Sequence, residues 1–234
     1  MASIDPIQGE TLIDLSYLKP KMRGHVRTRA ELAVVEANNV QKAFSKYLTA
    51  KPSRRLAPFT LKWSLKLHRE MFGTVWTWAG EMRKTDLNIG EPWGQVEGLL
   101  FSLLKDLRLW ADGELTMLDQ AVLLHYRAVA IHPFHDGNGR WSRLLANIWL
   151  RQHDSPVTLW PAQVGSKSPI RDEYVDAIHK ADSGDLGPLT ELHRRFTPVA
   201  LPPRRRIARP HDVPPQLRSA PPRRRRPLPP TANG

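Results

Sequence analysis

The chain has no cysteine and no long apolar run, and each absence excludes a class of function. Without cysteine among its 234 residues it can form no disulfide, no zinc–thiolate site and no thiol nucleophile. This absence fits the reducing cytosol, so we expect a cytoplasmic protein. No stretch of about 18 apolar residues occurs, so we expect no membrane-spanning helix. The first five residues lack the basic and apolar segments of a signal peptide.

The positive charge is concentrated at one end of the sequence. The formal net charge is +12, and residues 198–234 contribute +8 of it through nine arginines and one aspartate, which leaves +4 for residues 1–197. Residues 198–234 also contain 11 of the 21 prolines and few apolar side chains. We therefore expect a disordered, basic, proline-rich tail there. Binding of nucleic acid through this tail is one competing function, whereas a charge of +4 makes no strong demand for such a partner.

The remaining chain has the 3.6-residue periodicity of helices. Thr28 and Glu31 form a capping-box pattern, which predicts a helix over 28–47. Ser168 followed by Pro169 is typical of another helix start. Apolar stripes predict four more helices, which contain Leu61 to Phe72, Val96 to Trp110, Leu118 to Val129 and Trp141 to Trp149. These patterns indicate a mainly helical, all-α domain.

The stretch from Trp78 to Gly94 interrupts the helical pattern. It contains Gly80, Gly90 and Pro92, which break helices. It is either a plain connecting loop or a short hairpin beside an active site, because functional loops are often held by rigid scaffolds.

The run from Ile131 to Arg143 joins two predicted helices and carries a phosphate-binding pattern. Gly137 and Gly139 let the backbone turn sharply and approach a ligand closely. The helix that follows presents free N–H groups at its start, which favour an anion. Arg140 and Arg143 are three residues apart on one helix face. Two arginines with backbone donors suit a polyphosphate better than a single carboxylate.

A base and a metal ligand accompany this pattern. Asp136 is well placed to hold Mg²⁺ beside bound phosphates. His132 ends the preceding predicted helix and is the best general-base candidate in the chain. His125 is expected to be structural, and His135 to face solvent. The constellation predicts phosphoryl or nucleotidyl transfer without choosing between them, and a tight turn with a core histidine and surface arginines is the plain alternative.

The same run resembles the signature of the Fic/DOC family, H-x-F-x-[DE]-G-N-G-R-x-x-R, at every fixed position. The matching residues are His132, Phe134, Asp136, Gly137, Asn138, Gly139, Arg140 and Arg143. Trp78 to Arg83 resembles the W-A-G-x-x-R segment that precedes the family's flap hairpin, and Ala181 to Leu189 resembles its closing helices. The likeness covers most of residues 25–197, after an extension over 1–24. Within the family, the arrangement most resembles a bacterial subgroup called mobile mystery protein B.

The resemblance implies an all-α Fic fold with a short β-hairpin flap. It also implies a protein adenylyltransferase, a nucleotidyltransferase that moves AMP from ATP to a Tyr, Thr or Ser hydroxyl of a target protein. His132 would deprotonate that hydroxyl, Asp136 would hold Mg²⁺ or Mn²⁺, and Phe134 would be buried to fix the loop. The phosphates would be bound by the backbone of Gly137 and Gly139, by Asn138 at the α-phosphate, by Arg140, and by Arg143 at the γ-phosphate.

Two further segments take their roles from the resemblance. The flap would align the target protein as an added strand, through Thr85, Asp86, Leu87, Asn88 and Ile89. Many family members also have an inhibitory helix, [ST]-x-x-x-E-[GN], whose glutamate pairs with the second motif arginine. Glu36 takes that place in the helix over 28–47 and would pair with Arg143, although Leu32 and Ala37 depart from the pattern. Without this restraint, an antitoxin-like protein partner would take its place, as in toxin–antitoxin pairs.

Other functions compete with AMP transfer. Family members that transfer phosphate carry a lysine in place of the second glycine of the G-N-G, and Gly139 is retained here, which favours AMP transfer. Removal of AMP is a further Fic chemistry. A catalytically silent interaction module is disfavoured because the whole signature is present.

Overall fold

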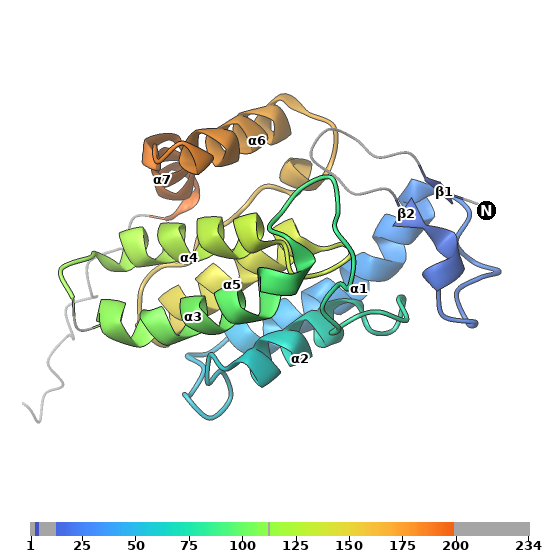
Figure 1. Cartoon of the computed structure of the whole chain (residues 1–234), viewed down its shortest axis with the longest axis horizontal. Coiled ribbons are helices and arrows are strands. Elements are labelled where there is room, and N and C mark those ends of the chain that lie inside the picture. The colour runs from blue at the N-terminus through green and yellow to red at the C-terminus, as the bar shows by residue number, and fades with distance from the viewer. Residues whose placement is uncertain (1–2, 5–12, 112, 199–234) are drawn as a thin grey trace, which may run out of the picture. The chain divides into compact units, whose positions relative to one another are not determined.

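The computed structural model describes residues 3–4, 13–111 and 113–198, and within these ranges the chain is mainly helical (Figure 1). Two short antiparallel strands come first, β1 (Ser3–Ile4) and β2 (Ile13–Asp14). The helices are α1 (Arg29–Leu48), α2 (Leu61–Phe72), α3 (Trp93–Ala111), α4 (Met117–Ile131), α5 (Asn138–Gln152), α6 (Pro169–Asp182) and α7 (Gly187–Phe196). None of these helices is long and apolar enough to cross a bilayer. The tail predicted over 198–234 lies outside the described residues from 199 onward.

Two helix starts form as their sequence signals predict. The Thr28 side chain accepts a hydrogen bond from the Glu31 backbone N–H, and the Glu31 carboxylate accepts one from the Thr28 N–H. This completes the capping box and begins α1 one residue after Thr28. Ser168 caps α6, with Pro169 in its first turn. The all-α fold expected from the sequence is therefore confirmed, with boundaries close to those predicted.

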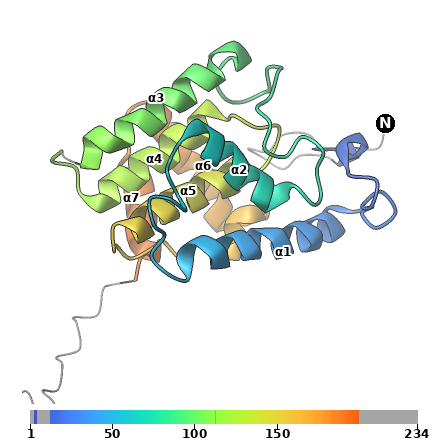
Figure 2. The same ribbon diagram turned by 90° about the horizontal axis from the view of Figure 1, so that it is seen from below.

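Helix α5 lies at the centre of the fold and packs along α4 (Figure 1). Its apolar stripe is fully or almost fully buried, at Trp141, Leu144, Leu145, Ile148 and Trp149. Figure 2 shows α1 running beside α2, and α1 also contacts α5. A second cluster of buried apolar residues joins α6 and α7 to α4, through Val122, Val164, Tyr174, Val175, Ala177, Leu189 and Leu192. The loop between α4 and α5 is thus surrounded by helices from both clusters.

The segment before α1 packs onto the main core. Leu18 pairs with Trp76 across an isolated antiparallel bridge, and both side chains are buried. The Lys19 N–H donates to the Val75 carbonyl at 2.8 Å. These contacts place part of the predicted 1–24 extension against the loop that follows α2.

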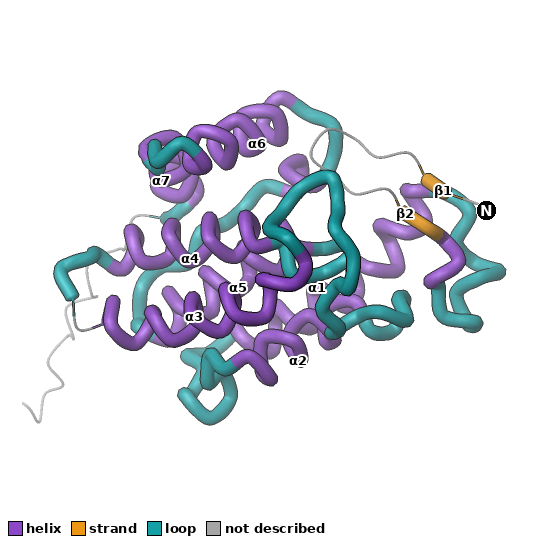
Figure 3. Tube along the Cα trace, in the orientation of Figure 1, coloured by secondary structure: helices purple, strands orange, loops and turns teal. Residues whose placement is uncertain are grey.

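The flap hairpin expected after Trp78 is not formed, because the described stretch between α2 and α3 contains no pair of strands (Figure 3). The Arg83 side chain instead donates to the carbonyls of Thr85 and Glu91, which lie on either side of residues 86–90. A backbone whose carbonyls bond to a central guanidinium cannot also use them in a strand ladder. The segment is therefore a loop wrapped around Arg83.

Candidate active site

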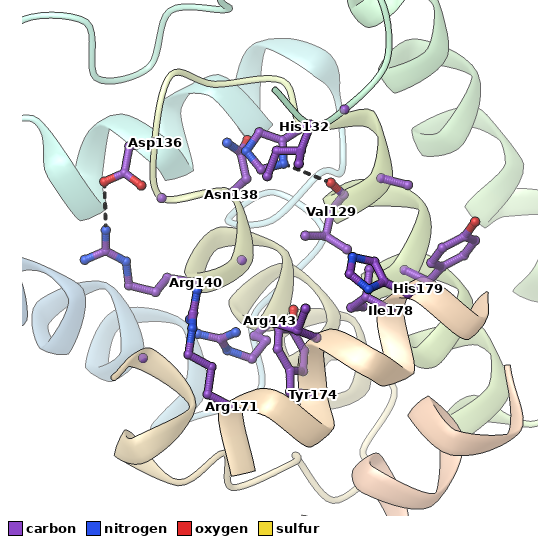
Figure 4. A pocket seen from close by; sticks show the side chains of 18 of the residues that line it. Val129, His132, Asp136, Asn138, Arg140, Arg143, Arg171, Tyr174, Ile178 and His179 are labelled. Carbon is purple, nitrogen blue, oxygen red and sulfur yellow. Dashed lines mark hydrogen bonds and ion pairs between the residues drawn. The ribbon is translucent and has the colours of Figure 1, made fainter. Parts of the chain in front are cut away.

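The residues singled out in the sequence converge on one cavity of about 570 Å³. It lies where the loop between α4 and α5 meets α1, α6 and the loop before α3 (Figure 4). The predicted site residues that line it are Glu36, Ile89, His132, Asp136, Gly137, Asn138, Gly139, Arg140 and Arg143. Phe134, Thr85, Asp86, Leu87 and Asn88 are not among the lining residues.

The position of His132 follows from the way α4 ends. Pro133 has no N–H with which to continue the helix, and His132 takes a left-handed conformation with φ 52° and ψ 60°. Such a backbone costs about 1–3 kcal/mol for a residue other than glycine. The ring Nδ1 lies 3.3 Å from the Val129 carbonyl, which can only accept, so Nδ1 carries the proton. Burial lowers the pKa of His132 to about 4, so the ring is neutral and its Nε2 keeps a lone pair.

Arg83 fixes the strained backbone around His132. Its Nε donates to the His132 carbonyl at 2.7 Å, and its own backbone N–H donates to the Pro133 carbonyl at 3.0 Å. The same guanidinium donates to the carbonyls of Thr85, at 3.0 Å, and Glu91. Arg83 therefore ties the loop before α3 to the candidate base. Its one signal in the sequence is its place as the last residue of the W-A-G-x-x-R resemblance.

Gly90 brings the same loop into direct contact with His132. Its φ is +95°, and a Cβ added there would overlap the Cβ of His132. The neighbouring Ile89 lines the cavity. A glycine at this position thus allows the loop to lie against the base.

His68 joins the loop after α2 to the loop between α4 and α5. The Gly80 N–H donates to Nδ1 at 3.0 Å, which leaves the proton on Nε2, and Nε2 donates to the Asp136 carbonyl at 3.0 Å. Burial lowers the pKa of His68 to about 3, in keeping with this neutral form. The ring stacks on Phe134 with centroids 3.6 Å apart. Phe134 itself is fully buried.

The Asn138 side chain bonds within the loop that precedes it. Its Oδ1 accepts from the Phe134 N–H at 2.9 Å, and its Nδ2 donates to the Phe134 carbonyl at 2.8 Å. Both ends of the carboxamide are therefore engaged in holding the loop. A role for this side chain at the α-phosphate stays a prediction.

The start of α5 has the backbone geometry that favours an anion. Gly137 is the N-cap residue, with φ +81°, and no described side chain caps the helix there. A Cβ at Gly137 would lie 2.6 Å from Cε2 of Phe72, so only glycine fits. Backbone N–H groups at the first turn of a helix therefore face the cavity, next to Gly139 and Arg140, and favour negative charge.

Glu36 pairs with the first motif arginine, which corrects the pairing with Arg143 expected from the resemblance. Its Oε2 accepts from the Arg140 guanidinium, and its Oε1 accepts from the Trp76 indole N–H at 2.5 Å. The Trp76 contact holds the carboxylate beside the first turn of α5. Arg143 lies one turn further along, with its guanidinium carbon 5.2 Å from the centre of the Tyr174 ring. Glu36 on α1, held by Trp76, therefore pairs with Arg140 and not with Arg143.

Asp136 fits a magnesium ion that is shared with a phosphate ligand. Within the described part of the chain, no group of three or more histidine, aspartate or glutamate side chains could hold a metal alone. Mg²⁺ commonly takes one or two carboxylates and completes its shell with phosphate oxygens and water. Asp136 supplies one carboxylate next to the start of α5, where it now accepts from Arg140 at 3.2 Å.

The two neighbouring histidines have different environments. His135 was expected to face solvent, yet it is half-buried and stacks with Tyr17 at 6.1 Å, because the segment before α1 covers the loop. Burial lowers its pKa. His125 is fully buried, as expected of a structural residue.

Arg171 and Tyr174 of α6 also line the cavity, and sequence patterns had given them no role. Figure 4 shows both close to Arg143. They stand beyond the signature by about thirty positions, and only the packing of α6 over α5 brings them to the site.

The part of the chain that contains the signature is similar to known proteins. Residues 58–150 match the Fic/DOC family. A protein adenylyltransferase Fic of Drosophila grimshawi is 36% identical over 152 residues, which cover 63% of this chain and 30% of that protein. Protein adenylyltransferase fic-1 of Caenorhabditis briggsae is 33% identical over 142 residues, 58% of this chain and 27% of that protein. The chain thus spans less than a third of the length of these relatives.

A solved structure has the same fold. The effector protein BepC of Bartonella tribocorum, solved with bound AMPPNP, aligns with a TM-score of 0.59 at 16% identity, over 80% of this chain and 99% of that one. The segment that matches the family begins just before α2 and ends within α5, and it contains the whole run from Ile131 to Arg143.

Proposed function

Since residues 58–150 match the Fic/DOC family, we propose that the chain transfers AMP from ATP to a Tyr, Thr or Ser hydroxyl of a protein. The observation that carries this proposal is that a neutral histidine, His132, and the open N-terminus of α5 line the same cavity. Similar proteins named protein adenylyltransferases support the choice of reaction. The AMPPNP bound to BepC supports ATP as the nucleotide.

The phosphates of ATP would bind at the start of α5. The first backbone N–H groups of the helix would bond to phosphate oxygens, and Arg140 and Arg143 would add two cations from the same helix. Asp136 would hold Mg²⁺ or Mn²⁺, which when bound neutralises phosphate charge as the leaving group departs.

The nucleoside would occupy the other part of the cavity. Tyr126, Val129, Val175 and Ile178 are among the residues that line the cavity. Figure 4 shows Ile178 and His179 on the side away from Asp136. An apolar lining of this kind suits the flat face of a base.

His132 would act as general base in a single displacement. The hydroxyl oxygen of the target attacks the α-phosphorus while its proton passes to Nε2 of His132. The bond between the α-phosphorus and the bridging oxygen breaks, and pyrophosphate leaves with that electron pair. The target then carries AMP on its oxygen, and His132 releases its proton to solvent. The Val129 carbonyl holds Nδ1–H throughout, which keeps Nε2 directed as the acceptor.

The loop before α3 would dock the target. Thr85, Asp86 and Asn88 are exposed there, and Gly90 holds the loop against His132. A hydroxyl presented by a segment bound along this loop would reach the base.

Glu36 would restrain the reaction. Its carboxylate lines the cavity and bonds to Arg140, one of the two cations assigned to the phosphates. While this ion pair lasts, Arg140 is directed at α1 and not at ATP. The restraint would therefore act on the way ATP binds.

The proposal is tested by following two labels in parallel. The full chain is incubated with a cell lysate, Mg²⁺ and either α-³²P-ATP or γ-³²P-ATP, and labelled protein is measured after electrophoresis. AMP transfer predicts label on protein only from the α-position, and its loss with His132→Ala. Label from the γ-position would mean phosphate transfer, and no protein label from either, in wild type or Glu36→Gly, would reject transferase activity.

A further inference from the structure

Buried polar side chains form a continuous file behind the cavity. His125 of α4 and His193 of α7 are both fully buried, and His125 Nδ1 lies 2.9 Å from His193 Nε2. The other nitrogen of His125 lies 3.0 Å from the Tyr174 hydroxyl. The other nitrogen of His193 lies 2.9 Å from the Thr158 hydroxyl, which in turn lies 3.0 Å from the Thr197 hydroxyl. Four separate segments of the chain therefore meet in one hydrogen-bonded file.

Both histidines of the file are neutral. Burial lowers the pKa of His193 to about 3 and lowers the pKa of His125 well below its ordinary value, and the nearby charge of Arg143 adds to both effects. A neutral imidazole has one N–H donor and one acceptor nitrogen. Each ring can therefore donate in one direction only.

The direction of the whole file is fixed at its far end. The Thr197 hydroxyl donates to the His193 backbone carbonyl at 2.7 Å, so it can only accept from Thr158. Thr158 then accepts from His193 Nδ1–H, and His193 Nε2 accepts from His125 Nδ1–H. His125 Nε2 must accept the Tyr174 hydroxyl proton. Every hydrogen in the file has one possible place.

This direction leaves the Tyr174 oxygen as an acceptor toward Arg143. The Arg143 guanidinium carbon lies 5.2 Å from the Tyr174 ring centre and 6.0 Å from the Trp160 ring centre. Burial raises the pKa of Tyr174, and the charge and hydrogen bonding of Arg143 oppose that rise. A guanidinium can only donate, so a tyrosine whose own proton is directed at His125 is the correct partner for it.

We propose that His125 and His193 are positioning residues that hold Tyr174 as a hydrogen-bond acceptor and thereby fix Arg143 in the cavity. This inference rests on the proposed function: the file would position Arg143 to bind the γ-phosphate of ATP. Tyr174 and His193 lie outside residues 58–150, so the helices after the matched domain take part in nucleotide selection.

The consequence is a preference for a triphosphate over a monophosphate. Arg143 held in one place pays less entropy on binding the terminal phosphate than a mobile arginine would. AMP lacks the γ-phosphate that Arg143 would bind, so its affinity does not depend on where Arg143 lies. The ratio of the triphosphate affinity to the AMP affinity therefore measures the effect of the hydrogen-bonded file on Arg143. A general loosening of the cavity would weaken both ligands and leave this ratio unchanged.

The experiment measures dissociation constants of the full chain by isothermal titration calorimetry in excess Mg²⁺. The ligands are AMP and α,β-methylene-ATP, which cannot transfer AMP. Tyr174→Phe keeps the ring and removes the acceptor oxygen, and it should weaken the triphosphate by roughly tenfold while AMP binds as in wild type. The matched control is Tyr47→Phe, which removes another buried hydroxyl, bonded to Glu70 outside the cavity. It should change neither affinity.

His193 extends the test to a residue that does not line the cavity. His193→Phe should weaken the triphosphate selectively, and His193→Gln, which retains a donor and an acceptor, should restore most of the loss. Equal affinities in all variants, or equal losses for both ligands in Tyr174→Phe, would overturn the inference. A wild type that binds neither nucleotide would instead reject the proposed function, and that result is seen before any variant is made.

Discussion

The Glu36 carboxylate of α1 and the Arg140 guanidinium of α5 form an ion pair between residues 104 positions apart. The Glu36 side chain is only 4% exposed, and Arg140 is 32% exposed. Arg140 also packs over the Phe72 ring and bonds to Asp136. The ion pair therefore links the candidate inhibitory residue Glu36 to the start of α5 and, through Arg140, to the candidate metal ligand Asp136.

Removal of the Glu36 carboxylate should release the site. Glu36→Gly is expected to raise self-modification with α-labelled ATP by about tenfold or more, since loss of a desolvated charge pair is commonly worth ~2–5 kcal/mol. The matched control is Ala37→Gly, which adds the same glycine to an exposed position of α1 and costs only about 1 kcal/mol of helix stability. Equal initial rates in wild type and Glu36→Gly would show that this contact is no brake.

Removal of the candidate base should stop the chemistry and spare binding. His132→Ala is expected to lower the transfer rate by about 10²- to 10⁴-fold, the usual share of general-base catalysis. The dissociation constant for ATP should stay close to that of wild type, because the groups proposed to bind the phosphates lie on α5. A variant with near-normal transfer would remove His132 from the mechanism.

The transfer rate should begin to fall only at a pH well below 6.5, the ordinary pKa of a histidine. Burial lowers the pKa of His132 to about 4, so the base stays neutral and active as the pH falls through 6.5. We expect a constant single-turnover rate between pH 8 and about 5.5. A rate that falls with a midpoint near 6.5 would mean that His132 is solvated during the reaction.

Gly90 should be needed for the loop to seat against the base. Gly90→Ala puts a methyl group into the space of the His132 Cβ, at a φ of +95° that alanine disfavours. We expect loss of transfer by at least tenfold, on the scale of about 1–2 kcal/mol for the left-handed backbone alone. Gly94→Ala, in α3 with open space around it, is the control and should behave as wild type in the same assay.

The fold itself should become less stable in mild acid. His68, His132 and His193 have pKa values of about 3, 4 and 3 in the folded chain, against 6.5 when exposed. Below pH 6.5 these histidines therefore bind protons in the unfolded chain but not in the folded one. The free energy of unfolding falls as the pH drops from about 6.5 toward 4. Each histidine contributes a slope of about 1.4 kcal/mol per pH unit in that window.

Urea unfolding at pH 7, 6 and 5 measures this loss directly. The midpoint is expected to fall steeply between pH 6 and 5, and His193→Gln should make the fall shallower. An unchanged midpoint from pH 7 to pH 5 would contradict the burial of neutral histidines.

Local patterns predicted the parts of the site that neighbours in sequence build. The capping box at Thr28 and the glycine turn at Gly137 each need only a few adjacent residues, so their spacing was sufficient. His132 and Asp136 follow from the same short run. The signature therefore predicts the residues of the loop between α4 and α5 that line the cavity, but not those that α1 and α6 contribute.

Contacts made across the fold were not available from such patterns. The partner of Glu36 depends on the Trp76 indole, which no periodicity places beside α1. The hairpin expected after Trp78 gave way to carbonyls gathered by Arg83. No sequence pattern gave Tyr174 a role, and its hydrogen bond to His125 forms only when α6 packs against α4.

Most hydrogen bonds of the Arg83 side chain go to main-chain carbonyl oxygens. Its guanidinium bonds to the carbonyls of Thr85, Glu91 and His132, and carbonyls are present whatever side chains the loop carries. Exchange of the exposed side chains of Thr85 and Asn88 would therefore leave these main-chain contacts of Arg83 in place. If the loop docks the target as proposed, changes of its exposed side chains would alter the choice of target and leave the main-chain bonds to His132 in place.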